Sequence, residues 1–109
     1  MTFFIIRQRL KIFCSASVKA TIEPVLVVGG RVVYRVRAGM IIDQQRPSVA
    51  DFDAVIDINF SSEHEALLFA YAFASRCPAN ADYWTAESYA YDVADRLESA
   101  RDKLLSMSA

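Results

Sequence analysis

Serine and cysteine nucleophiles usually depend on a histidine, and this chain contains a single one, His64. It lies between Glu63 and Glu65, at the start of a segment with helical periodicity. A histidine between two carboxylates in the first turn of a helix is typical of a solvated surface, with proton sensing as the alternative use. We therefore expect a chain that is not an enzyme and binds no cofactor.

A second group with possible chemistry is a cluster of carboxylates. Such oxygen ligands can bind Mg²⁺ or Ca²⁺, and paired carboxylates can act as acid and base. The spacing D-x-D-x-x-x-D lacks the glycine and the terminal glutamate of a calcium-binding loop. We expect the solvated side of a strand and no metal site. The cluster comprises Asp51, Asp53, Asp57, Glu63 and Glu65.

The pair Gly29-Gly30 is the only candidate for a phosphate-binding loop. It lacks the spacing of either glycine-rich nucleotide motif, and a strand pattern follows it instead of a helix. Two glycines between β-rich segments predict a two-residue hairpin turn with positive φ. That turn would place Val28 opposite Arg31 and Leu26 opposite Val33.

The two cysteines, Cys14 and Cys77, lack the spacing of metal ligands and predict two buried or semi-buried thiols in a reducing cytosol. At the N-terminus, charges follow only a few apolar residues, unlike the pattern of a secretory signal. The longest uncharged helical stretch, ALLFAYAFAS, is shorter than the roughly 20 residues that span a bilayer. We therefore expect a cytoplasmic chain with no membrane segment.

Four segments have the composition and alternation of β-strands: residues 3–13, 18–28, 31–42 and 51–60. The first also has apolar residues at helical spacing, typical of a basic membrane-binding helix, but its β-branched and aromatic content favours a strand. The last, DFDAVIDINF, places Phe52 and Ile56 on one side and Asp53 and Asp57 on the other. Pro24 cannot donate to a ladder and indicates an edge or a bulge.

Two helices should follow the strands. Ser62 and Glu65 form an S-x-x-E capping box, and Cys77-Pro78 ends that helix. The second helix is expected from about Thr85 to Met107. Both helices carry alanines at i, i+4 and i+8, which allow close helix packing.

These elements predict an α+β two-layer sandwich in the order ββββαα, with 109 residues forming a single domain. An antiparallel sheet of three or four strands would be covered on one face by an antiparallel helix pair. A hydrophobic content of 54% excludes intrinsic disorder.

Charge is distributed unevenly along the chain. Residues 1–46 carry eight basic and two acidic groups, a net charge of +6, whereas residues 47–109 carry four basic and eleven acidic groups, a net charge of −7. Such asymmetry indicates contact with nucleic acid, an acidic interaction surface, or pairing within the molecule.

The expected register places six cations on the sheet face away from the helices, although a slip of one residue would move that whole set to the other face. Such a face is poor in central aromatic residues, on which RNA-binding sheets stack bases. A surface of arginine and aliphatic side chains is more typical of a protein interface. The six cations are Arg7, Arg9, Lys11, Arg31, Arg35 and Arg37.

Aromatic residues gather before and within the second helix. Trp, Tyr and Arg are enriched at binding hot spots, so we expect Tyr83 and Tyr89 to be partner-binding residues. Trp84 is expected to close the end of the core instead.

The sequence thus predicts a small, non-catalytic protein-interaction module: a regulator, inhibitor or assembly partner. It would bind another protein, or a second copy of itself, through the basic sheet face or through an acidic helical layer. The alternative is a nucleic-acid-binding protein that uses the basic face.

Overall fold

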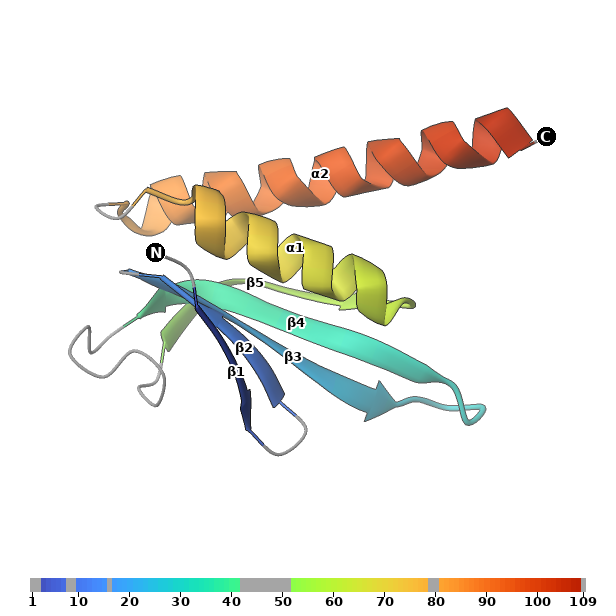
Figure 1. Ribbon diagram of the computed structural model, residues 1–109, viewed down its shortest axis with the longest axis horizontal. Coiled ribbons are helices and arrows are strands. Elements are labelled where there is room, and N and C mark those ends of the chain that lie inside the picture. Colours follow the sequence, from blue (N-terminus) through green and yellow to red (C-terminus); the bar gives the residue numbers. More distant parts are fainter. Residues whose placement is uncertain (1–2, 8–9, 16, 42–51, 79–80, 109) are drawn as a thin grey trace.

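The backbone forms a five-stranded antiparallel sheet whose strands lie side by side in chain order, with two helices on one face (Figure 1). The structure is a computed structural model that describes residues 3–7, 10–15, 17–41, 52–78 and 81–108. The elements are β1 (Phe3–Arg7), β2 (Leu10–Cys14), β3 (Val18–Leu26), β4 (Val32–Ile41), β5 (Phe52–Phe60), α1 (Glu63–Arg76) and α2 (Tyr83–Ser108). The predicted α+β two-layer sandwich is confirmed, with five strands where three or four were expected.

The additional strand arises from the N-terminal segment, which was predicted as one strand over residues 3–13. It is a hairpin in which Phe4 pairs with Phe13 and Arg7 with Leu10. The residues between the two strands, 8–9, lie outside the described part of the chain. Three successive polar residues, Arg7-Gln8-Arg9, interrupt the alternation, and this signal indicates the break.

The β3–β4 hairpin has a loop of three residues instead of the predicted two. The Val27 N–H donates to the Arg31 carbonyl over 2.8 Å, and the Gly30 N–H donates to the Val27 carbonyl over 3.2 Å. Gly29 and Gly30 have φ values of 95° and 77°, which glycine adopts without steric cost. Val28 therefore belongs to the loop, where it is fully exposed.

This longer loop shifts the β3–β4 register by one residue. Leu26 now pairs with Val32, Glu23 with Arg35, and Thr21 with Arg37. Because side chains alternate along a strand, the shift moves all of β4 to the opposite face relative to β3. The predicted faces were therefore wrong for this hairpin.

A β-bulge in β5 divides its alternating pattern. Val36 pairs with Ile58 and Ala38 with Ile56, but Gly39 pairs with Ala54, so that Val55 is an extra residue. The side chains of β5 before the bulge therefore lie on the faces opposite to those that the alternation predicts, and Phe52 lies on the face away from the helices. At Gly39 a Cβ atom would lie 1.8 Å from the Asp53 carbonyl oxygen, so glycine permits this close approach.

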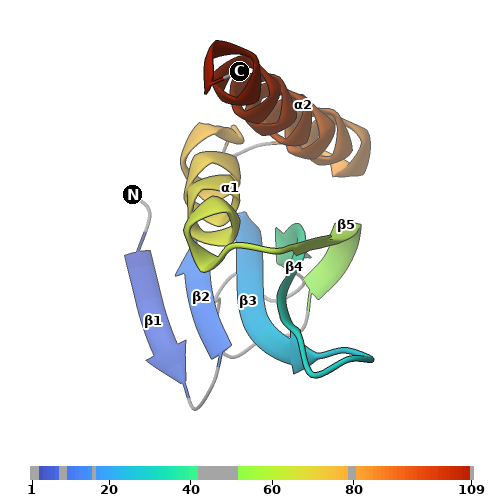
Figure 2. The same cartoon turned by 90° about the vertical axis from the view of Figure 1, so that its right-hand side faces the viewer.

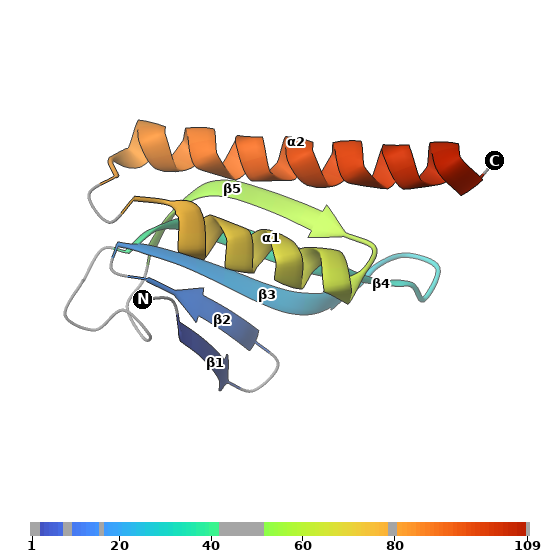
Figure 3. The ribbon, with the colours of Figure 1, turned by 45° about the horizontal axis from the view of Figure 1, so that its top comes forward.

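The helices begin at polar caps. The Ser62 hydroxyl accepts a hydrogen bond from the Glu65 N–H, as the capping box predicts. Asp82 caps α2 through the Thr85 N–H at 2.8 Å, so the second helix begins at Tyr83, two residues before the predicted start. The helices are antiparallel (Figure 3). Alanines of both helices are buried.

The core lies between the sheet and the two helices. Phe69 and Phe73 of α1 are fully buried against a sheet surface that includes Ile22 and Val36. Helix α1 packs on β2 to β5, and α2 packs on α1, β4 and β5. Strand β1 lies at the margin of the sheet, beyond the main packing surface of α1 (Figure 2).

Candidate functional site

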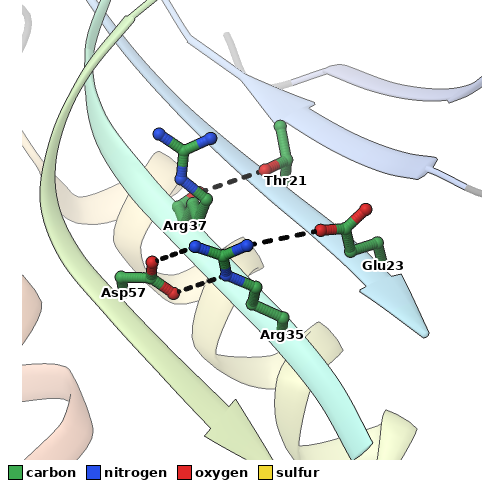
Figure 4. A network of polar contacts seen from close by, with 5 residues as sticks. All are labelled: Thr21, Glu23, Arg35, Arg37 and Asp57. Carbon is green, nitrogen blue, oxygen red and sulfur yellow. Dashed lines mark hydrogen bonds and ion pairs between the residues drawn. The ribbon is translucent and has the colours of Figure 1, made fainter. Parts of the chain in front are cut away.

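The sheet face away from the helices, called here the open face, carries an ion-pair network centred on Arg35 (Figure 4). Its guanidinium donates to both carboxylate oxygens of Asp57, over 2.9 and 2.5 Å, and lies 3.8 Å from the carboxylate of Glu23. The hydrogen bonds from Arg35 hold the pKa of Asp57 below its usual value and raise the pKa of Arg35. This arginine is therefore oriented by neighbours on both adjacent strands.

Arg37 and Lys19 flank the ring of Phe52 on the same face. The Arg37 guanidinium carbon and the Lys19 Nζ each lie 5.4 Å from the ring centroid, within the range of cation–π contact. The Thr21 hydroxyl donates to the Arg37 carbonyl over 3.5 Å. Phe52 reaches this position because of the bulge in β5, which the sequence pattern did not indicate.

Lys11 does not belong to the open face, contrary to the prediction. It pairs with Ile22, whose side chain is in the core, and its Nζ forms an ion pair of 2.8 Å with Glu63 at the start of α1. The prediction placed Lys11 beside Arg35 because it assumed a two-residue turn. The three-residue loop separates the two cations onto opposite faces of the sheet.

Of the remaining predicted cations, only Arg31 has a described side chain, and it lies apart from the network. Arg7 ends β1, where its side chain is outside the described set, and Arg9 is one of the residues that are not described. Arg31 is exposed beside a cleft of about 530 Å³ between the β3–β4 hairpin and α2, which Leu97 and Arg101 also line. In the described part of the chain, the predicted set is thus reduced to Arg35 and Arg37 on one shared face.

Tyr83 and Trp84 form an exposed aromatic pair at the start of α2. Their rings meet edge to face, with centroids 5.3 Å apart. Trp84 is 72% exposed, so the expectation that it closes the core was wrong. The start of α2 at Tyr83, two residues before the predicted start, explains this, because it sets Trp84 in an exposed first turn. Tyr89 lies farther along α2, partly buried beside Asp92 and Arg96.

An apolar groove between β1, β2 and α1 was not predicted from the sequence. It encloses about 430 Å³. The ring centroids of Phe4 and Phe13 are 4.8 Å apart. The rings of Phe13 and Tyr71 meet edge to face, with centroids 6.1 Å apart. Ile6 extends the same face along β1. We call the groove together with Ile6 the β1–α1 surface; the groove residues are Phe4, Phe13, His64, Leu67, Leu68 and Tyr71.

One sequence signal could have indicated this groove. The stretch ALLFAYAFAS is apolar on every side of α1. The sheet and α2 bury two of those sides, as expected, and Leu68 and Tyr71 remain exposed on a third. A helix with an apolar third side requires either a further covering element or a partner.

The histidine and the two cysteines considered for catalysis or metal binding lie at separate places in the fold. His64 is exposed at the rim of the groove, as predicted. Cys14 and Cys77 are buried, and burial raises the pKa of each thiol. Among the described residues, no group of three or more potential ligands could hold a metal ion, and neither α1 nor α2 has the hydrophobicity over its length that a membrane span needs. Comparisons of the chain with models of protein families, with curated proteins and with solved structures find no match.

Proposed function

We propose that this chain is a non-catalytic protein-interaction module and that it binds an extended segment of a protein partner at the β1–α1 surface. The exposed apolar side chains around this groove carry the proposal. Phe4 is 46% exposed, Ile6 64%, Leu68 43% and Tyr71 56%. Large apolar side chains gathered in one place mark protein contact sites more often than scattered ones do.

The edge of the sheet supports the same surface. Within the described residues β1 pairs only with β2, which leaves its outer row of backbone N–H and C=O groups for another strand. Natural edge strands are usually protected by charged residues, proline or a bulge, and the only charged residue in Phe3–Arg7 is the last. A partner strand added to β1 would satisfy these backbone groups and place alternate side chains against Phe4 and Ile6.

The open face is a second contact surface in this proposal, and its charge balance favours protein over nucleic acid. Lys19, Arg35 and Arg37 carry three positive charges, and Glu23 and Asp57 carry two negative ones, which leaves a net charge of +1. Because carboxylates already neutralise Arg35, little positive field remains for phosphate. The acidic side chains of α2 are a further contact candidate, as the sequence suggested.

Nucleic-acid binding remains the second candidate because of Phe52. Its partly exposed ring has the exposed guanidinium of Arg37 over it, and an arginine–aromatic pair of this kind can contact a base or a phosphate. Fluorescence anisotropy with a labelled single-stranded RNA at low salt tests this candidate. Binding that weakens steeply with salt and is lost in Phe52→Ala would replace the protein-interaction proposal.

Affinity capture with two variants tests the proposed surface. Ile6→Lys places a charge on the β1–α1 surface, and Val28→Lys places the same charge on the exposed loop of the β3–β4 hairpin. We expect a protein retained by the wild type and by Val28→Lys to be lost with Ile6→Lys. That protein, once purified, should bind Ile6→Lys at least about tenfold more weakly, which corresponds to about 1.4 kcal/mol. Equal binding to both variants would rule out the β1–α1 surface.

A further inference from the structure

We infer that the strand added to β1 is β1 of a second copy of this chain. The two strands would pair antiparallel about a two-fold axis and join two five-stranded sheets into one. This inference rests on the proposed function, since it names the partner at the same surface.

The composition of β1 supports self-pairing. In an antiparallel pair centred on Ile5, Phe3 lies opposite Arg7 of the second copy, and Phe4 lies opposite Ile6. This is the one register that pairs all five residues of Phe3–Arg7. It also keeps the two Arg7 residues away from each other, because each lies opposite a phenylalanine. Like charges directly opposite would oppose the pairing, and this register avoids them.

The exposed side chains suit the same arrangement. Phe4 and Ile6 lie on the helix-covered side of the sheet, since they pair with Phe13 and Lys11. A two-fold axis perpendicular to the sheet keeps that side common to both copies. Each Phe4 would then meet the Ile6 of the other copy, with Cβ atoms about 4.5–5.5 Å apart. The same Phe4–Ile6 contact would thus form twice, once on each side of the two-fold axis, as an isologous interface requires.

The position of α1 leaves room for the second copy. Helix α1 packs on β2 to β5, with its main contacts on β3 and β4. Five inter-strand steps would separate β3 of one copy from β3 of the other, about 24 Å at 4.7–4.9 Å per step. Packed helices need only about 8–10 Å, so the two α1 helices would not collide. Leu68 and Tyr71 of each copy would line a common apolar trough above the paired strands.

The charge around the groove is compatible with a like partner. Of its lining residues, only His64 can carry a positive charge, and it lies at the rim. Lys11 of β2 and Glu63 of α1 form an ion pair within one copy. Two copies can therefore approach without bringing unpaired like charges together at the described part of this surface.

Sedimentation velocity over a range of concentrations tests the inference. We expect the wild type and Val28→Lys to dimerise with the same affinity, and Ile6→Lys to dimerise at least tenfold more weakly. A wild type that stays monomeric at the highest concentration would overturn the inference. So would a dimer of equal affinity in Ile6→Lys, in particular one that weakens instead in Arg35→Ala, which would assign dimerisation to the open face.

Engineered disulfides test the register. At position 5 the two Cα atoms would be within the range of about 4.4–6.8 Å that a disulfide requires, so Ile5→Cys should form a covalent dimer on mild oxidation. Phe4→Cys/Ile6→Cys should do the same by linking position 4 to position 6, and it serves if Ile5→Cys does not fold. Val28→Cys is the control, because it lies at the far hairpin, and Cys14 and Cys77 are buried. Absence of the covalent dimer in the folded variants, or its formation only in Val28→Cys, would overturn the pairing.

These outcomes separate the two proposals. A monomeric wild type whose captured partner is lost with Ile6→Lys overturns the self-pairing and leaves the proposed function intact. A monomeric wild type whose captured partner binds Ile6→Lys normally overturns both.

Discussion

The ammonium group of Lys11 lies 2.8 Å from the carboxylate of Glu63 and links β2 to the first turn of α1. Both side chains are partly exposed, so the pair should contribute little to the free energy of unfolding, about 0–1 kcal/mol. Its larger effect is on the position of the Lys11 side chain. This cation was predicted for the open face, but it lies on the opposite face of the sheet, beside the first turn of α1.

A double-mutant cycle of Lys11→Met and Glu63→Gln should therefore give a coupling free energy below about 1 kcal/mol in urea denaturation. Glu63→Gln should cost more than Lys11→Met, because Glu63 also lies at the positive end of the α1 dipole. A coupling of several kcal/mol would contradict this description of the pair.

The ion pair of Arg35 and Asp57 predicts a pH dependence of stability. Arg35 lowers the pKa of Asp57 in the folded chain, whereas an unfolded aspartate titrates near about 3.9. The stabilisation is therefore fully present above that unfolded value and is lost as the pH falls through the lower folded pKa. Urea denaturation between about pH 5 and pH 2 should show a steeper loss of stability for the wild type than for Asp57→Asn. Asp95→Asn, which removes an exposed carboxylate of α2, is the control and should follow the wild type. Parallel curves for the wild type and Asp57→Asn would contradict the assigned effect of Arg35.

Gly39 should tolerate substitution worse than a glycine with positive φ. A Cβ at Gly39 would lie 1.8 Å from the Asp53 carbonyl oxygen and 2.6 Å from its carbon, so the bulged segment of β5 would have to move. We expect Gly39→Ala to lower the free energy of unfolding by about 2–3 kcal/mol or more. Gly29→Ala meets open space and only backbone strain, about 1 kcal/mol. Equal losses in the two variants would show that β5 does not approach β4 as described.

Trp84 should contribute little to stability despite its size. Because its side chain is 72% exposed, Trp84→Ala should change the free energy of unfolding by less than about 0.5 kcal/mol. Phe69→Ala removes a fully buried ring of the core and should cost about 3–5 kcal/mol. In the wild type, acrylamide should quench Trp84 fluorescence nearly as well in the folded as in the unfolded chain. Strong protection from quenching would show that Trp84 closes the core after all.

Much of the fold could be predicted from the sequence because the relevant interactions are local. Alternating side chains in 51–60, two glycines between β-rich segments, and the capping box at Ser62 and Glu65 each act within a few residues. These signals were sufficient for the α+β sandwich and for the helix positions, to within two residues at the start of α2. The separation of Asp57 from the core was also predicted correctly.

The candidate site depended on relations that no local pattern encodes. A single extra residue in the β3–β4 loop turned Arg35 and Arg37 to the face opposite Lys11, and the bulge at Val55 brought Phe52 beside Arg37. Each is an offset of one residue, which neither the composition nor the alternation of the sequence reveals. Because side chains on a strand alternate with period two, each offset moves the side chains of a segment to the other face of the sheet. The groove beside β1 likewise exists only because the helices pack over the other strands. Local sequence patterns thus specified which segments become strands and helices, whereas tertiary packing set which side chains share a surface and which remain uncovered.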